Sequence, residues 1–355
     1  MIKFGIVGFG LAAKVFHLPI LTRLAGAKVT AVYSSKPKQE IQAVVPDAEV
    51  FDSVDHFIAQ ADIDVVVVLT PNDFHADIAS KAMLANKHVI IDKPFVCSVD
   101  EGTALIALAE KQQTLLSVYH NRRWDGDFLT AKKLIGEGKL GELRYFESRF
   151  DKYRPRVWGR WREQDRPGAG LIFDLASHLI DQALHLLGLP EKVFAKALAQ
   201  REGAEANDYY DIQLSYNRGL TQVRLRGSSF ARATPFRFYI EGTEGTFIKQ
   251  AQDVQEAQLA ANMSPFDDAF GVDKPANYGQ WLRMPPEGNI QNKEHDEPVI
   301  IETERGSYFS YYENFVAAVK GESSLDVPAE QALNVIKVIE LAFQSSQLGQ
   351  ELDFV

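Results

Sequence analysis

The stretch Gly8-Phe9-Gly10-Leu11-Ala12-Ala13 decides the fold of the first part of the chain. It follows an apolar run, Ile2–Val7, that predicts a strand, and it opens a helical pattern. Gly8 permits the tight turn, Gly10 lets the backbone approach a pyrophosphate, and Ala13 is small enough for close helix–strand packing. A helix that starts here offers N–H groups to phosphate oxygens. A glycine pair alone fits a simple turn equally well, so the surrounding sequence has to decide.

Repeated strand–helix units follow this turn and favour the dinucleotide interpretation. Runs dense in Val, Ile and Leu predict buried parallel strands at 29–33, 65–69, 89–91 and 115–119. Helical patterns cover 73–85 and 99–111, and Ser98 with Glu101 predicts a capping box before the second. Such alternation builds a parallel sheet with right-handed crossovers. We therefore expect an N-terminal Rossmann domain, a doubly wound α/β unit over residues 1–121, that binds a dinucleotide at Gly8, Gly10, Leu11 and Ala12.

The remainder of the chain, residues 122–355, has a different pattern. Helices are predicted at 128–137, 173–187 and 329–348, and longer alternating strands at 192–200, 211–216, 221–228 and 236–240. Residues 251–296 are polar and broken by Pro and Gly, which predicts a long excursion between strands. We expect a C-terminal α+β domain with a large, mostly antiparallel, open sheet. The two domains are expected to pack directly and to leave a cleft between them.

Composition excludes several classes of protein. The 355 residues carry 38 Lys and Arg against 48 Asp and Glu, and a net charge of −10 argues against a binder of nucleic acid through diffuse positive charge. The longest apolar runs are strand-sized, far short of the roughly 20 residues that span a bilayer. A single cysteine, Cys97, excludes an intrachain disulfide and a cysteine-based zinc site. Because Met1–Gly5 leads directly into a strand pattern without a secretion signal, we expect the protein in the reducing cytoplasm.

The end of the strand at 29–33 indicates which dinucleotide binds. In this fold an acidic residue about twenty positions after the glycines normally binds the ribose 2′-hydroxyl. Here Ser34, Ser35, Lys36 and Lys38 occupy the segment, and the first carboxylate is Glu40. Hydroxyls and ammonium groups suit a 2′-phosphate, so NADP(H) is predicted rather than NAD(H). The alternative is a solvated loop that merely lacks the acid.

Further polar clusters follow the ends of the predicted strands, where ligands of open α/β sheets bind. Their cofactor-binding candidates are Thr70, Pro71, Asn72, His75, Asp92, Lys93 and Asn121. Lys93 comes directly after a buried strand, so its ammonium is expected to bind a substrate oxygen and stabilise a developing alkoxide. The alternative is a salt bridge from Lys93 to Asp92 or to another carboxylate.

The predicted helix 173–187 is apolar nearly all round, yet Asp174, His178, Asp181 and His185 form one narrow polar line along it. A buried helix tolerates such a line only if its members are paired or face a wet cavity. Asp174 and His178 are nearest to the glycine-rich turn 167–170, and we expect them to form the acid–base pair. Asp181 and His185 are interpreted as satisfied core polar groups. A metal site is disfavoured because no motif completes the ligand spacing.

Basic and aromatic residues alternate between Tyr153 and Arg162, as in proteins that bind single-stranded nucleic acid. The overall negative charge and the lack of a second such stretch favour contact with a substrate or a cofactor, together with anchoring of the loop. The candidate substrate-binding residues are Arg122, Tyr153, Arg156, Trp158 and Trp161.

These clusters, in this order, resemble the glucose-fructose oxidoreductase/inositol dehydrogenase/MocA family of two-domain dehydrogenases. The glycine-rich turn, Asp92-Lys93-Pro94, and Asp174 with His178 match the family pattern, except that Asp92 stands where the family usually has glutamate. Residues 115–125, 153–156 and 161–163 look especially like those of bacterial NADP-dependent scyllo-inositol dehydrogenases. The resemblance implies Lys93, Asp174 and His178 as the catalytic set. It also implies a homodimer or homotetramer assembled through the C-terminal sheet.

The expected activity is therefore NADP(H)-dependent hydride transfer at a secondary alcohol of a cyclic polyol or sugar. One alternative is the same chemistry on a different diol or keto-sugar. A second alternative, from another class of protein, is a dinucleotide-sensing regulator without catalysis. The joint presence of Lys93, Asp174 and His178 counts against the regulator, since a sensor needs no acid–base pair.

Overall fold

The computed structural model describes residues 1–285 and 297–355, so residues 286–296 of the predicted excursion lie outside the described residues. The chain forms two compact units. The first consists of Met1–Asn121, Gln255–Phe270 and Ser307–Ile336, and the second of Arg122–Val254, Gly271–Gly306 and Lys337–Val355. Within the described residues, no helix is both long and apolar enough to cross a membrane.

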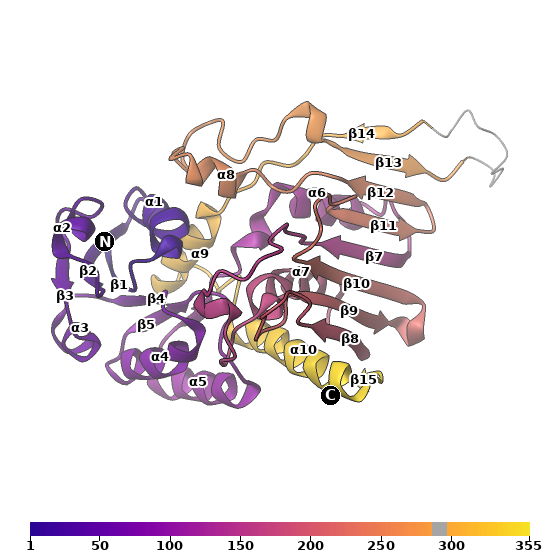
Figure 1. The fold of residues 1–355 in the computed structure, drawn as a ribbon. Coiled ribbons are helices and arrows are strands. Elements are labelled where there is room, and N and C mark those ends of the chain that lie inside the picture. The colour runs from indigo at the N-terminus through magenta and orange to yellow at the C-terminus, as the bar shows by residue number, and fades with distance from the viewer. Residues whose placement is uncertain (286–296) are drawn as a thin grey trace. The chain divides into compact units, whose positions relative to one another are not determined.

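The first unit is built on a parallel six-stranded sheet in the order β3-β2-β1-β4-β5-β6 (Figure 1). Its strands are β1 Ile2–Val7, β2 Ala27–Tyr33, β3 Glu49–Phe51, β4 Val65–Val68, β5 His88–Ile91 and β6 Leu116–Val118. Five of them confirm the predicted strands to within two residues, whereas the short β3 was not predicted. The order is that of two mononucleotide-binding halves joined at β1 and β4, so the doubly wound Rossmann prediction is confirmed.

Helices cover both faces of this sheet, because successive residues of a strand point to opposite sides. Phe4 packs against Tyr312 and Phe315 of α9 (Phe309–Val319), with ring centroids 6.1 and 6.5 Å apart. At Gly5 an added Cβ would lie 2.5 Å from the Phe57 ring of α3 (Val54–Gln60). Further helices of this unit are a π-helix at Ala13–His17, α1 Leu18–Leu21, α2 Lys38–Gln42, α4 His75–Leu84, α5 Val99–Gln112 and α8 Gln255–Ala260.

The predicted cap of α5 is present in a modified form. The Ser98 hydroxyl accepts the N–H of Glu101 at 3.3 Å, as the prediction requires. The Glu101 carboxylate accepts the N–H of Cys97 at 3.0 Å, one residue before the position that a capping box uses.

The second unit contains a nine-stranded sheet in the order β14-β13-β12-β11-β7-β10-β9-β8-β15. Only β7 and β10 pair in parallel, and the other neighbours are antiparallel. The strands are β7 Leu143–Arg149, β8 Lys192–Leu198, β9 Tyr209–Tyr216, β10 Thr221–Ser228, β11 Phe238–Gly242, β12 Gly245–Lys249, β13 Gly279–Arg283, β14 Val299–Ile301 and β15 Leu352–Asp353. The α+β prediction is confirmed, and β8 to β11 match the predicted strands.

The predicted excursion at 251–296 is partly wrong. It contains α8 and also β13, which pairs with β12 on one side and β14 on the other. The five-residue strand Gly279–Arg283 alternates around Trp281, and this pattern is too short to stand out within a polar stretch.

Helices α6 Gly126–Gly136, α7 Ser177–Leu187 and α10 Ala329–Leu348 lie against one face of the large sheet (Figure 1). Phe128 of α6 packs on Phe238 of β11 with ring centroids 6.5 Å apart, and Ser345 of α10 accepts the N–H of Ala195 in β8 at 3.0 Å. A π-helical turn, Ile172–Ala176, leads directly into α7. All three predicted helices of this part of the chain are therefore confirmed.

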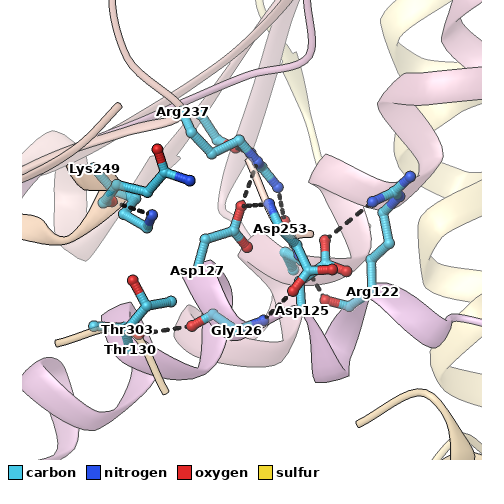
Figure 2. A network of polar contacts seen from close by, with 12 residues as sticks. Arg122, Asp125, Gly126, Asp127, Thr130, Arg237, Lys249, Asp253 and Thr303 are labelled. Atoms are coloured by element: carbon cyan, nitrogen blue, oxygen red, sulfur yellow. Dashed lines mark hydrogen bonds and ion pairs between the residues drawn. The ribbon is translucent and has the colours of Figure 1, made fainter. Parts of the chain in front are cut away.

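A buried ionic network in the second unit joins the start of α6 to distant segments (Figure 2). The Gly126 N–H donates to the Asp253 carboxylate at 2.7 Å, and the Asp253 N–H donates to Asp127 at 3.1 Å. Arg237, which is fully buried, binds Asp127 at 3.3 Å and also donates to Ser148. The network therefore joins the start of the first stretch of this unit, near Arg122, to the end of that stretch, near Val254.

Candidate active site

The glycine-rich turn has the geometry that a pyrophosphate needs. Gly8 has φ of +104°, and a Cβ there would lie 2.8 Å from the carbonyl oxygen of Leu69, so only glycine fits. At Gly10 a Cβ would meet nothing within 4 Å, which means that the backbone there borders open space. The chain is helical from Leu11 onwards, and Leu11 is itself exposed. The turn therefore fits the phosphates of a dinucleotide.

The first carboxylate in the segment after β2 is occupied by a neighbouring ammonium group. Glu40 in α2 accepts a hydrogen bond from the Lys14 ammonium at 2.6 Å, and this bond lowers the pKa of Glu40 below its ordinary value. Ser34 accepts the N–H of Lys36 at 3.1 Å, which turns the chain directly after β2. The hydroxyl and ammonium groups of residues 34–38 follow β2 directly, and groups of these kinds can bind phosphate oxygens.

The structure brings the remaining cofactor-binding candidates to the same edge, since parallel strands end there. Thr70, Pro71 and Asn72 follow β4, Asp92 and Lys93 follow β5, and Asn121 follows β6. His75 is fully buried and connects two of these loops. Its ring nitrogens lie 3.0 Å from the carbonyl oxygens of Thr70 and of Pro94, and burial lowers its pKa. His75 therefore positions the loops, while its contact with a cofactor stays a prediction.

Lys93 stands in a turn that its neighbour shapes. The Lys93 N–H donates to the Asp92 carboxylate at 2.8 Å, and the following peptide bond to Pro94 is cis. The Asp92 side chain thus binds the backbone of Lys93.

In the second unit, Asp174 and His178 lie four residues apart where the π-helical turn passes into α7. The Arg162 guanidinium lies 3.4 Å from the Asp174 carboxylate. His178 is buried, and its ring stacks on Phe150 with centroids 6.3 Å apart. The Arg122 guanidinium packs on the same Phe150 ring at 4.7 Å. The structure therefore gathers Asp174, His178 and Arg122 around two residues, Arg162 and Phe150, that were not among the candidates.

The rest of the polar line on α7 has the structural role that the sequence suggested, with one difference. Asp181 is buried and receives two hydrogen bonds from Arg123, at 2.9 and 2.6 Å. His185 is exposed rather than in the core, because it lies near the end of the helix, and its Nε2 is 2.9 Å from the Lys132 ammonium. Partial burial of the ring and the charges of Arg123 and Lys132 lower the pKa of His185 to about 4.

Arg201 holds the loop at residues 153–163, which carries the other substrate candidates. This guanidinium donates to the Arg156 carbonyl at 3.1 Å and to Glu163 at 2.7 Å, and its Nε donates to Asp208 at 2.8 Å. Tyr153, Arg156 and Trp158 are exposed, and Trp161 is half-buried beneath the Arg162 guanidinium at 4.4 Å. Trp161 is thus the one aromatic candidate that the structure connects to Asp174, through Arg162.

Two family models match the chain and together cover nearly all of it. The model described as "Oxidoreductase family, NAD-binding Rossmann fold" matches residues 2–120. The model described as "Oxidoreductase family, C-terminal alpha/beta domain" matches residues 132–354. The chain belongs to the Gfo/Idh/MocA oxidoreductase family. The resemblance expected from the sequence is therefore confirmed, and the first unit is an NAD(P)-binding Rossmann domain.

Relatives within the Gfo/Idh/MocA family span the whole chain. The scyllo-inositol 2-dehydrogenase (NADP(+)) IolW of Bacillus subtilis is 39% identical over 98% of this chain and 94% of its own length. The inositol 2-dehydrogenase of Rhizobium meliloti is 26% identical over 97% of this chain and 96% of its own. The solved structure of the putative oxidoreductase yvaA from Bacillus subtilis superimposes with a TM-score of 0.94 at 38% identity, covering 100% of this chain and 98% of the other.

Proposed function

We propose that this protein is a dehydrogenase that oxidises a secondary alcohol of a cyclic polyol or sugar, such as scyllo-inositol, reversibly and with NADP(H). The observation that carries the proposal is the 39% identity over almost the full length to an enzyme named scyllo-inositol 2-dehydrogenase (NADP(+)). The groupings at Lys93 and at Asp174 with His178 supply the chemistry that such a reaction needs.

Each of the three catalytic candidates has one task in this proposal. His178 accepts the proton of the substrate hydroxyl, because imidazole exchanges protons near neutral pH. The Lys93 ammonium binds the same oxygen and stabilises the negative charge that develops on it. Asp174, held by Arg162, binds a neighbouring hydroxyl or orients the imidazole. The glycine-rich turn at Gly8 and Gly10 would hold NADP⁺, which would supply the acceptor for the hydride that leaves the substrate carbon as the carbonyl group forms.

The preference for NADP(H) rests on the residues that follow the carboxyl end of β2. Glu40 is the first carboxylate after this strand, and its ion pair with Lys14 occupies it at 2.6 Å. Ser34, Ser35 and Lys36 are then available to a 2′-phosphate, whose dianion would be repelled by an unpaired carboxylate. NAD(H) is the less favoured cofactor.

A panel of inositols and aldoses, each incubated with NADP⁺ and with NAD⁺, tests the proposal by the absorbance of the reduced cofactor. We expect turnover of at least one inositol, with NADP⁺ preferred. Turnover of another diol or keto-sugar alone would establish the first alternative. Tight NADPH binding without turnover of any compound would favour the dinucleotide-sensing regulator, although Lys93, Asp174 and His178 speak against it.

We further propose that the protein is cytoplasmic and forms a homodimer or homotetramer through the large sheet. The sheet face opposite α6 and α7 carries paired side chains, including Arg149 with Glu147 at 2.7 Å and Arg224 with Asp211. A face that carries paired groups of both charges can form a self-complementary contact. Light scattering of the purified protein tests this, and a monomer at micromolar concentration would contradict it.

A further inference from the structure

Asp92 lies in the first unit at the end of β5, within a shell of groups that are positive or neutral. Its side chain is mostly buried, and its Oδ1 accepts the N–H of Lys93 at 2.8 Å. The titratable groups that face it are Lys93 in its own turn, His17 from the π-helix, His75 from α4, Tyr119 after β6 and Tyr312 from α9. None of these groups is acidic.

Packing alone does not explain the direction in which the His17 ring points its Nε2 atom. It is fully buried, and its Nδ1 lies 2.6 Å from the Tyr312 hydroxyl. Its ring packs on Tyr119 at a centroid distance of 4.2 Å, so it has one orientation. In that orientation the buried Nε2 has no hydrogen-bond partner and faces the Asp92 Oδ1 at 3.9 Å. A buried nitrogen without a partner is costly, so its direction calls for an explanation.

The charges in the shell keep Asp92 ionised. Burial alone would raise the pKa of this carboxyl, but the interaction with His17 and the charge of Lys93 outweigh burial and lower it. Burial and the charge of Asp92 raise the pKa of Tyr312, so its phenol keeps its proton and can donate it to His17. The result is an ordered series of Tyr312, His17 and Asp92 that ends at the backbone of Lys93.

We propose that His17 is a positioning residue for Lys93 and acts through the Asp92 carboxylate. This inference rests on the proposed function, in which the Lys93 ammonium binds the reacting oxygen. The same oxygen of Asp92 faces His17 and binds the Lys93 N–H, so movement of the carboxylate moves the turn that presents Lys93. At 3.9 Å the contact is longer than a hydrogen bond, and a shift of about 1 Å, or one added methylene, closes it.

The first experiment measures the reactivity of the Lys93 amine as a function of pH, and it needs no turnover. The protein is labelled with trace isotopic acetic anhydride, and the extent of Lys93 acetylation is read by mass spectrometry. Asp92→Asn weakens the acceptor of the Lys93 N–H and loosens this turn, so the acetylation profile of Lys93 shifts towards greater labelling. His17→Phe keeps a ring but removes both nitrogens, and it shifts the profile in the same direction by a smaller amount. His17→Gln retains an N–H donor near the place of Nε2 and restores the profile.

Double variants distinguish positioning of Lys93 through Asp92 from a general loosening of the fold. Because His17 acts through Asp92, His17→Phe adds nothing to the shift when Asp92→Asn is already present. Tyr312→Phe, which removes the hydroxyl at Nδ1, gives a partial shift and serves if His17→Phe fails to fold. The exposed His56→Gln on α3 is the matched control and leaves the profile unchanged. An unchanged Lys93 profile in folded His17 or Tyr312 variants, or shifts that simply add in the double variant, would overturn the proposal.

Turnover supplies the second readout. With an active polyol substrate, His17→Phe lowers kcat about tenfold and leaves the NADP⁺ KM within about twofold, because a displaced catalytic group affects the chemical step. His17→Gln and Asp92→Glu, which can close the gap, keep most of the wild-type kcat. A His17→Phe enzyme with wild-type kcat contradicts the inference. If wild-type protein oxidises no polyol, the proposed function fails, and the labelling experiment still decides the role of His17.

Discussion

The surroundings of His178 suit a side chain that transfers a proton. The side chain is 5% exposed, it stacks on Phe150, and it stands one helical turn after Asp174. A buried imidazole with an apolar ring on one side has a fixed orientation, which a general base requires.

Replacing His178 with Ala tests this assignment. We expect kcat to fall by about 10²–10⁴-fold, the usual contribution of a positioned base, while NADPH affinity stays within about twofold. Steady-state kinetics across pH and NADPH fluorescence titration give the two values. His56→Ala, on the exposed surface of α3, controls for loss of an imidazole. Wild-type turnover of the His178→Ala enzyme at every pH would show that another group is the base.

Replacing Lys36 with Ala tests the assignment of NADP(H) as the cofactor. Lys36→Ala is expected to raise the NADPH Kd about tenfold and to leave the NADH Kd unchanged, because only NADPH carries the 2′-phosphate. Lys28→Ala, an exposed lysine on β2, is the matched control. An equal effect on both cofactors would mean that Lys36 does not contact the 2′-phosphate.

The candidate residues could be predicted where the signal is local. Asp174 and His178 stand out because they are polar on an apolar helix, and Gly8 and Gly10 because they lie between a strand and a helix. Arg162 and Phe150 give no such signal, since their contacts with Asp174 and His178 join residues 12 and 28 positions apart. Only the folded sheet brings these side chains together.

At the scale of elements, α7 is anchored by a buried ion pair. Arg123 and Asp181 are both buried, and their two hydrogen bonds at 2.9 and 2.6 Å join the turn after Asn121 to the middle of the helix. Gln182, the next residue of α7, donates to the Arg122 carbonyl at 2.7 Å. The helix that carries His178 is therefore fixed to the segment that carries Arg122.

Removing one partner of this ion pair exposes its role. Arg123→Met removes two hydrogen bonds and a positive charge from the buried Asp181 carboxylate, and we expect the free energy of unfolding to fall by about 3–5 kcal/mol. The double variant Arg123→Met/Asp181→Leu removes both charges and is expected to recover most of that loss. Urea denaturation measures both changes. A loss below about 0.5 kcal/mol in the single variant would show that water reaches the Asp181 carboxylate.

Elements with a continuous apolar run or clear amphipathicity were predictable, and those with polar residues on their inner face were not. β1 and α10 match their predicted bounds in full. β7 was missed, because Ser148 stands on its inner face where it binds Arg237, and this interrupts the apolar alternation. The edge strands β14 and β15, and β13 beside β14, are too short for a periodic signal.

At the scale of the whole molecule, the path of the chain is the least local feature. Gln255–Phe270 and Ser307–Ile336 belong to the first unit, although the sequence between them belongs to the second. Periodicity reports which face of an element is buried and says nothing about which core receives it. α9, whose rings cover β1, is the clearest example.

In the second unit, Gly126 lies against two segments that are distant in the sequence, one at Asp253 and one at 304–306. A Cβ at Gly126 would lie 2.3 Å from the Glu304 carbonyl oxygen and 3.3 Å from the Gly306 nitrogen. Gly126→Ala is therefore expected to lower the melting temperature by several degrees, as a strained backbone contact does. Calorimetry measures the change, and Gly136→Ala, where a Cβ meets nothing within 4 Å, is the control. Equal melting temperatures for both variants would show that the loop at 304–306 adapts without cost.

The most direct test of the proposed function follows the hydride itself. Wild-type protein is incubated with NADP⁺ and scyllo-inositol deuterated at its ring carbons, and the reduced cofactor is analysed by mass spectrometry. The account predicts NADPH that carries one deuterium, formed faster than the corresponding NADH from NAD⁺, and lost in His178→Ala. Reduced cofactor without deuterium, or no reduced cofactor from any cyclic polyol, would contradict it.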